Sequence, residues 1–289
     1  MKIAFLHQLE NKLRKEVKRL FSGGINRVWA DDIYQKTEGL FRCKDSIDVL
    51  ALGSSHGAFG FKAQLNEFNF CTASQDLYYS WKLYESLAVE LPQLKTVMLF
   101  YSVFSPGFEL ERTGELGRCE YYFSILGIPY KTKEIQEKKG NKNIRTLWEG
   151  YAKKHPLLLS QDYRGNEVLQ KTMKISLEER VQAHLKHNRR NNGQSRFLEQ
   201  MKFRAEQCGH RIVVVIPPFR KDYVEKVGAF DEVFSELKNI NNLGFLNFYN
   251  DETFTAKDFV DMDHLNPVGA EKLSQKLRRY LTGEINRNG

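Results

Sequence analysis

The sequence has few cysteines and no long apolar segment. Its four cysteines (Cys43, Cys71, Cys119 and Cys208) are widely spaced and form no Cys-x-x-Cys pair, which indicates reduced thiols rather than a disulfide framework. No apolar run is long enough to cross a bilayer, and the apolar residues 3–6 are too few for the core of a secretory signal peptide. These absences predict a cytoplasmic protein without a transmembrane segment.

The chain also lacks the short motifs of nucleotide and nucleic-acid binding. It has neither a glycine-rich phosphate loop nor a dinucleotide fingerprint, so no bound nucleotide cofactor is expected. The net charge of +8 comes without zinc-finger spacing or an RNP-like aromatic strand, which argues against nucleic acid as a partner. The excess is concentrated in 131–154 and 184–204, where solvated surfaces are the simpler interpretation and attraction to a polyanion or an acidic membrane surface is the alternative.

A metal site is not predicted either. His184 and His187 are spaced i, i+3, but no third ligand accompanies them, so we interpret them as part of a solvated helix face. The next basic pair, Arg189 and Arg190, can bind a phosphate or carboxylate through paired hydrogen bonds, although simple solvation is the alternative.

The sequence does contain five short apolar runs separated by helical stretches. The runs cover residues 47–53, 68–74, 94–102, 210–218 and 244–250. Their nearly continuous apolar character is typical of parallel strands that are covered on both faces. The helical stretches cover residues 74–90, 175–208 and 223–239, and a last helix begins at Asn266-Pro267, where Asn is a good N-cap.

This alternation predicts one doubly wound, three-layer α/β domain at 46–289, with a large helical insertion at about 103–205 after the third strand. Residues 1–45 are expected to form a basic amphipathic helix with a short arm, which packs on the domain, on a partner or at a membrane surface. Ligands of such sheets bind at the carboxyl ends of the strands. The segments found there are "GSSHG", "TASQD", "YSVFSP" and "PPFRKDY".

The segment "GSSHG" after the first strand is the first candidate functional element. Gly53-x-Ser55-x-Gly57 fits the G-x-S-x-G turn on which α/β-hydrolases expose a nucleophilic serine. In those enzymes, however, the nucleophile follows several strands, whereas Ser55 follows the first. An ordinary Gly/Ser turn is the alternative interpretation.

The segment "DMDH" before the last helix is the second candidate element. A serine nucleophile needs a base to take its proton and an acid to orient that base, and Asp261 and His264 can supply both from one loop. Asp263 is expected to point away from the histidine that follows it. Alternatively, His264 bonds the backbone at the helix start while the two aspartates favour the helix dipole.

A serine after the first strand combined with a C-terminal Asp-x-x-His resembles the SGNH (GDSL-like) hydrolase superfamily. The segments "VLALGSSHGAFGF", "NFCTASQDLYYSWKL" and "DMDHLNPVGAEKLS" are similar to members associated with bacterial surface polysaccharides, and the resemblance covers 45–105 and 205–282. It implies a flavodoxin-like five-stranded parallel sheet in the order 2-1-3-4-5 and acyl-ester chemistry on carbohydrate. In that chemistry Ser55 is the nucleophile, His264 the general base and acid, and Asp261 its orienting partner.

The sequence departs from the family pattern at the groups that bind the oxyanion. Ser54 stands where the family usually has aspartate, the glycine of the second block has no clear counterpart in "TASQD", and the Gly-x-Asn-Asp of the third block is missing. The candidate replacements are backbone N–H groups near Ser55 and Ser74, and side chains that could bind the oxyanion or the substrate. The residues considered for this are Ser74, Gln75, Ser102 and His56. For His56 a purely structural role is the alternative.

These features together predict a polysaccharide O-acetyltransferase that forms an acyl-enzyme through a Ser-His-Asp triad. Loss of one good oxyanion donor costs roughly two to three orders of magnitude in rate, so the departures favour a specialised transferase over an efficient hydrolase. Acetyl-CoA is the expected donor, no cofactor is expected to stay bound, and Arg189 and Arg190 are candidates for contacting the donor phosphates or a charged glycan. The alternatives are a carbohydrate O-acetyl esterase and a non-catalytic assembly or glycan-binding protein with this fold.

Overall fold

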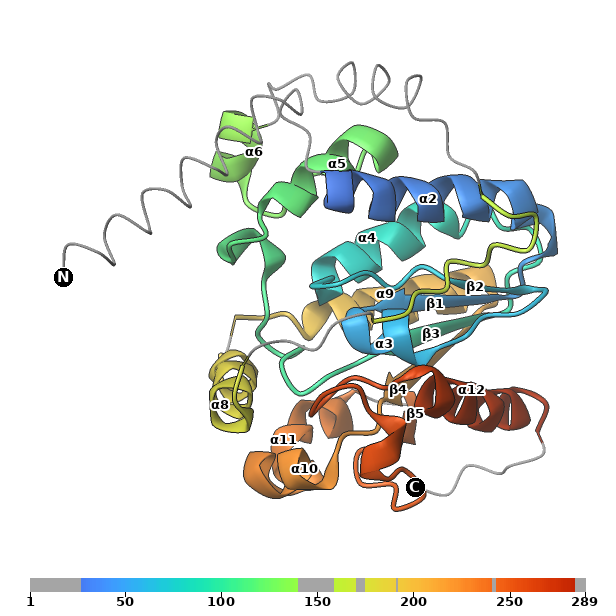
Figure 1. Cartoon of the computed structure of the whole chain (residues 1–289). Coiled ribbons are helices and arrows are strands. Elements are labelled where there is room, and N and C mark those ends of the chain that lie inside the picture. Colours follow the sequence, from blue (N-terminus) through green and yellow to red (C-terminus); the bar gives the residue numbers. More distant parts are fainter. Residues whose placement is uncertain (1–26, 140–158, 170–174, 191, 241–242, 284–289) are drawn as a thin grey trace.

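The computed structural model describes residues 27–139, 159–169, 175–190, 192–240 and 243–283. Five strands form one parallel sheet in the order β2-β1-β3-β4-β5 (Figure 1). The strands are β1 Val49–Gly53, β2 Glu67–Asn69, β3 Thr96–Phe100, β4 Arg211–Ile216 and β5 Gly244–Asn247. Both the predicted three-layer α/β fold and the predicted strand order are confirmed.

The helices lie between the strands and on both faces of the sheet. They are α2 Arg27–Cys43, α3 Ser55–Gly60, α4 Leu77–Leu87, α5 Gly117–Leu126, α6 Lys133–Lys139, α8 Leu177–Asn188, α9 Arg196–Cys208, α10 Lys221–Val227, α11 Phe230–Val233 and α12 Pro267–Leu281. Short 3-10 helices are η1 Lys44–Ser46, η2 Leu110–Arg112, η3 Ser235–Asn239 and η4 Ala256–Asp258. None of the helices in this described part of the chain is both long and apolar enough to cross a membrane.

Two hydrophobic cores lie on opposite faces of the sheet because successive strand residues point in opposite directions. Leu50 and Leu52 of β1 pack with α2, α4, α5 and α9 on one face. Val49 and Ala51 pack with α3 and α12 on the other face (Figure 1). All four of these strand residues are buried, which explains the continuous apolar runs in the sequence.

Three predicted elements differ in extent. Strand β2 is shorter than the predicted 68–74, because the chain turns after it and Ser74 adopts a left-handed backbone conformation with φ 60°. The predicted helix 175–208 is two helices, α8 and α9, separated by a turn in which Gly193 also has a positive φ of 70°. The predicted helix 223–239 is split into α10, α11 and η3.

The insertion is shorter than the predicted 103–205. Helix α9 packs against α4 and β4, which makes it the crossover helix between β3 and β4 rather than part of an added unit. The described parts of the insertion therefore include η2, α5, α6, α8 and the segment 159–169. Much of the basic segment 131–154 lies outside the described residues.

The N-terminal region is described from residue 27 onward, and the rest of the predicted arm lies outside the described residues. Within α2, Lys36 is 1% exposed and donates from Nζ to the carbonyl oxygens of Gly165 at 2.6 Å and Asn69 at 3.3 Å. It also pairs with Glu167 at 2.6 Å. Lys36 thus ties α2 and the insertion segment 159–169 to the edge strand β2.

Candidate active site

The serine segment forms a tight turn from β1 into α3 at the carboxyl edge of the sheet. Gly53 ends the strand with a φ of 129°, a conformation that side chains disfavour, and an added Cβ would collide with the backbone of Phe100. A Cβ on Gly57 would collide with the Phe100 ring and with Cys71 Sγ. The two glycines therefore let α3 lie close to the sheet, with Ser55 as its first residue.

Ser55 meets His264 although 209 residues separate them in the chain. Ser55 Oγ lies 2.9 Å from His264 Nε2, and His264 Nδ1 lies 3.0 Å from Asp261 Oδ2. If Nδ1 carries the proton and donates to the carboxylate, Nε2 is free to accept the serine proton. The structure thus brings the three predicted residues into the order that a nucleophilic serine requires.

The loop "DMDH" is held by its own carboxylate. Asp261 Oδ1 accepts from the backbone N–H of Asp263 at 3.0 Å and of His264 at 2.8 Å. Burial by itself raises the pKa of Asp261, but the hydrogen bond and charge interaction with His264 outweigh burial and lower this pKa below its ordinary value. Asp261 is therefore ionised at neutral pH.

The Asn266 side chain then caps α12, as predicted, by accepting from the N–H groups of Val268 and Gly269.

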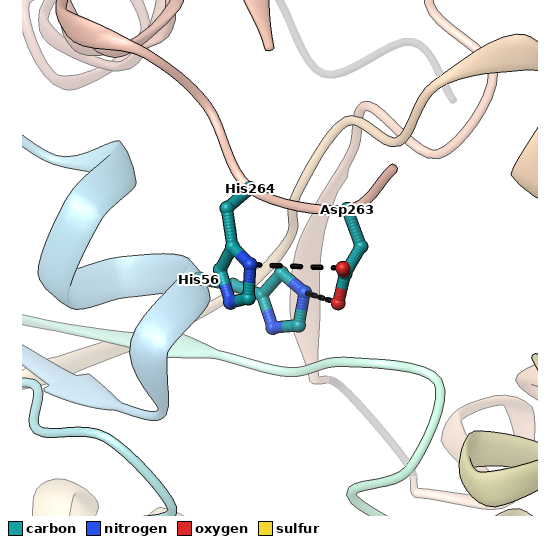
Figure 2. A group of neighbouring side chains, drawn as sticks. All are labelled: His56, Asp263 and His264. Atoms are coloured by element: carbon teal, nitrogen blue, oxygen red, sulfur yellow. Dashed lines mark hydrogen bonds and ion pairs between the residues drawn. The ribbon is translucent and has the colours of Figure 1, made fainter. Parts of the chain in front are cut away.

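Asp263 points into the site, so the prediction that it points away from His264 is wrong. Its Oδ2 accepts from His56 Nε2 at 3.1 Å, and its Oδ1 lies 3.6 Å from His264 Nδ1 (Figure 2). Arg180 of α8 donates to Oδ2 from Nη2 at 2.6 Å and from Nε at 3.0 Å. Asp261 bonds the backbone N–H of Asp263, and the resulting turn directs the Asp263 carboxylate toward the half-buried Arg180 guanidinium and the buried His56 imidazole.

His56 is buried beside the nucleophile and is engaged by protein groups. Its Nε2 faces Asp263, and its Nδ1 lies 2.7 Å from Ser102 Oγ. Its ring stacks on that of His264 with centroids 4.9 Å apart and an interplanar angle of 16°. Burial lowers the pKa of His56 to about 4, so the ring is neutral at physiological pH. These contacts favour the structural role for His56 over contact with substrate.

The other histidine near the site comes from α8. His184 is buried, its Nδ1 lies 2.5 Å from Tyr223 Oη of α10, and its Nε2 lies 3.9 Å from Asp263 Oδ2. Burial lowers its pKa well below the ordinary value. The prediction of a solvated face is wrong for His184, because α8 packs against α10. His187 is half-buried, with its ring 5.0 Å from that of Phe108.

The remaining predicted substrate contacts differ in their availability. Gln75 donates to Ser80 Oγ at 3.1 Å and accepts from Tyr122 Oη at 3.0 Å, so both ends of its buried amide are engaged. Ser102 is likewise buried and engaged with His56. Ser74 is half-buried at the turn after β2. Gln75 and Ser102 therefore support the site from within rather than facing a substrate.

Arg189 and Arg190 lie at the end of α8 and line a pocket of about 170 Å³. The pocket lining is mostly polar and includes none of the three triad residues. Its other lining residues are Pro106, Asn188, Asn192, Gly193, Gln194, Ser195 and Glu236. This pocket therefore gives no contact between the arginine pair and Ser55.

His56, Asp263 and His264 are close enough together to be considered as metal ligands, with their ligand atoms within 4.8 Å of one another. Their donor atoms are already committed, because Arg180 binds the Asp263 carboxylate and His264 Nδ1 faces Asp261. A cation placed here would also face the guanidinium. The arrangement therefore fits proton transfer and does not fit a resident metal ion.

Comparison with protein-family models gave no match, and comparison with curated proteins gave none either. Among solved structures, the chain is similar to one described as "The structure of a putative platelet activating factor from Streptococcus pneumonia". The two share 12% identity with a TM-score of 0.41, over 96% of this chain and 99% of that chain. A likeness at this level identifies neither a family nor an activity.

Proposed function

We propose that the protein is a serine-dependent acyl-ester enzyme that transfers an acetyl group to a carbohydrate hydroxyl. The observation that carries the proposal is the alignment of Ser55 Oγ, His264 Nε2 and the Asp261 carboxylate, with contacts of 2.9 and 3.0 Å. The sequence resemblance to the SGNH superfamily supplies the carbohydrate substrate class. Acetyl-CoA is the proposed donor, which implies action in the cytoplasm.

In the first half of the proposed reaction, His264 Nε2 accepts the Ser55 proton while Oγ attacks the acetyl carbonyl carbon. The tetrahedral intermediate collapses, the carbon–sulfur bond of the donor breaks, and His264 returns the proton to the leaving thiolate. An acetyl ester remains on Ser55. Throughout this half-reaction, Asp261 stabilises the imidazolium that forms on His264.

In the second half, a sugar hydroxyl takes the place of the departed thiol. His264 accepts its proton while the sugar oxygen attacks the acetyl ester, and the ester bond to Ser55 breaks as His264 returns the proton to Oγ. The oxyanion formed in both halves needs hydrogen-bond donors. The backbone N–H groups of Ser55 and His56 are suitable donors, because the bonds of this first helical turn begin with the N–H of Gly57, which donates to Ser54 O at 3.0 Å.

The preference for a sugar acceptor over water rests on the oxyanion groups. The third-block Gly-x-Asn-Asp is missing from the sequence, and Gln75 is engaged within the protein. Fewer oxyanion donors slow attack by either nucleophile, but a bound and oriented sugar hydroxyl gains from proximity, which bulk water does not. If water is the acceptor, the same triad makes the protein a carbohydrate O-acetyl esterase.

The proposal is tested by incubating the full chain with labelled acetyl-CoA or p-nitrophenyl acetate and measuring the intact mass. We expect a mass increase of one acetyl group, located on Ser55 by peptide mapping and absent in Ser55→Ala. Ser46→Ala, a change at an exposed serine outside the site, is the matched control and should be acetylated like the wild type. Release of the label to a glycan supports the transferase, and release only to water makes the protein an esterase. No label on Ser55 from either donor favours the non-catalytic alternative.

A further inference from the structure

We propose that Asp263 is a second positioning carboxylate for His264, held in place by Arg180, so that helix α8 of the insertion completes the active site. This inference rests on the proposed function, because it assigns a role within the same reaction. Neither Asp263 nor Arg180 is a residue that the Asp-x-x-His pattern specifies.

The Asp263 carboxylate is engaged by both Arg180 and His56. This carboxylate is buried, and Arg180 binds it in a forked geometry with Nη2 at 2.6 Å and Nε at 3.0 and 3.2 Å. Bidentate arginine–carboxylate pairs are among the strongest and most directional side-chain interactions in proteins. Because Arg180 lies on α8 and Asp263 on the loop before α12, this pair fixes the insertion helix against the catalytic loop.

Asp263 also lies close to the general base, His264. Its Oδ1 lies 3.6 Å from His264 Nδ1, while Asp261 lies 3.0 Å from the same nitrogen. A negative charge at this distance stabilises the imidazolium that forms when Ser55 loses its proton. Arg180 offsets part of that charge, so the two residues together set how basic the site is.

A chain of hydrogen bonds runs from Ser102 through His56 to Asp263, which lies beside the base. Ser102 Oγ contacts His56 Nδ1, and His56 Nε2 contacts Asp263. A hydrogen on Nε2 of the neutral His56 leaves Nδ1 to accept from the serine hydroxyl. The His56 ring then stacks on His264. Asp263 thus acts on His264 through charge and, by way of His56, through the orientation of the ring.

Several other charged or titratable groups surround His264 and Asp263. The loop carries Asp261, helix α3 carries His56, and α8 carries Arg180 and the buried His184, whose Nε2 lies 3.9 Å from Asp263 Oδ2. Arg220, from the segment before α10, is paired with Asp222 and also interacts with Asp261. Among these, the Arg180–Asp263 pair can be altered from either side, which permits a test with opposite expected signs.

The test is the pH dependence of kcat/KM for p-nitrophenyl acetate in the full chain. Asp263→Asn removes the negative charge, so the acidic limb of the profile should move to lower pH by about one unit, with roughly a tenfold loss of maximal rate. Arg180→Gln leaves the carboxylate without its counterion, so the same limb should move to higher pH by a similar amount. Arg180→Lys keeps the charge and should restore the wild-type limb position, although not the full rate.

Lys186→Gln, at an exposed position of the same helix, is the matched control and should leave the profile unchanged. Opposite shifts for Asp263→Asn and Arg180→Gln support the inference. Loss of rate in both with an unshifted limb means that the pair is only structural, and this overturns it. Thermal melts of all variants identify any that fail to fold; if Asp263→Asn is one of them, a limb shift in Arg180→Gln that is absent in Arg180→Lys supports the inference, and no shift in either overturns it.

A second measurement does not require turnover. Nitrogen NMR of labelled histidine should show the His56 proton on Nε2 in the wild type, with the tautomer mixed in Asp263→Ala, which removes the acceptor. An unchanged tautomer in Asp263→Ala overturns the inference. A wild-type protein that shows the Nε2 tautomer but never acylates Ser55 refutes the proposed function while leaving the contact network established.

Discussion

Asn69 is a single buried side chain on which the placement of the nucleophile helix depends. Its Nδ2 donates to the carbonyl oxygens of Phe61 at 2.7 Å and Gly57 at 2.9 Å, and its Oδ1 accepts from the N–H of Cys71 at 3.1 Å. The side chain is fully buried. It therefore joins the end of β2 to the last turn of α3, the helix that begins with Ser55.

Asn69→Ala removes the partner of the Phe61 carbonyl and of the Cys71 N–H, whereas the Gly57 carbonyl still accepts from the N–H of Phe61 at 3.0 Å. Each such group costs about 1–3 kcal/mol when unpaired, so we expect a loss of about 4 kcal/mol in the free energy of unfolding. Asn69→Asp keeps the shape and the acceptor but loses both donors. It also places negative charge against two carbonyl oxygens, so its penalty should grow as pH rises above the ordinary carboxyl range.

The assay is urea unfolding followed by circular dichroism, with acylation of Ser55 measured in parallel. Asn166→Ala is the matched control, because this exposed side chain also bonds backbone groups, the N–H and carbonyl of Ala63 at 2.8 and 2.9 Å. Water can replace those bonds, so its cost should stay below about 1 kcal/mol. If Asn69→Ala costs no more than Asn166→Ala, Asn69 does not hold α3 and the reasoning fails.

Four further outcomes are expected. Gly57→Ala should destabilise the protein by about 1–3 kcal/mol in thermal or urea melts, because its Cβ meets Phe100 and Cys71, whereas Gly114→Ala, with open space around it, should be neutral. Asp261→Asn should lower the rate of Ser55 acylation by about two to four orders of magnitude, while the melting temperature stays close to that of the wild type. An unchanged acylation rate would contradict the role of Asp261 in the triad. Lys36→Met should lower the free energy of unfolding in urea by about 3–5 kcal/mol, because two carbonyl oxygens and Glu167 lose a buried cation. An unchanged unfolding midpoint would show that α2 is held by other contacts. Burial raises the pKa of Glu236 to about 7, so the contribution of this side chain to stability is present below the ordinary glutamate pKa of 4.5 and is lost as pH rises through about 7. Glu236→Gln should therefore gain stability relative to the wild type between pH 5 and 8, whereas the same change at the exposed Glu232 should not.

Much of the fold could be predicted from the sequence because the determining patterns are local. A strand covered on both faces must be continuously apolar, so β1, β3 and β4 stand out as runs such as "TVMLFYS" and "RIVVVIPP". The start of α12 was equally predictable. The Asn266 side chain accepts hydrogen bonds from the first N–H groups of the helix, and Pro267 has a backbone angle that suits the first helical position. The strand order was implied by the family resemblance rather than by any local pattern.

The candidate triad was predictable for a related reason. Asp261 and His264 lie three residues apart, so one loop can orient the pair, and Ser55 follows a strand whose carboxyl end faces the same edge of the sheet. Their identity and spacing are properties of the sequence. That Ser55 Oγ comes within 2.9 Å of His264 Nε2 depends on how β1, α3 and α12 pack.

The tertiary structure alone decided which charged and polar groups surround that triad. Asp263 turns inward because Asp261 bonds its backbone N–H and because Arg180, 83 residues earlier in the chain, meets it there. His184 is buried because α8 packs on α10; Val181 and Leu185 mark the buried face of its helix, but the partner, Tyr223, comes from a distant segment. Burial and long-range pairing depend on which faces of distant helices meet, whereas caps, turns and strands are set by neighbours in the chain. The sequence therefore determined the elements and the three candidate catalytic residues, and the packing of the insertion determined the charge that acts on them.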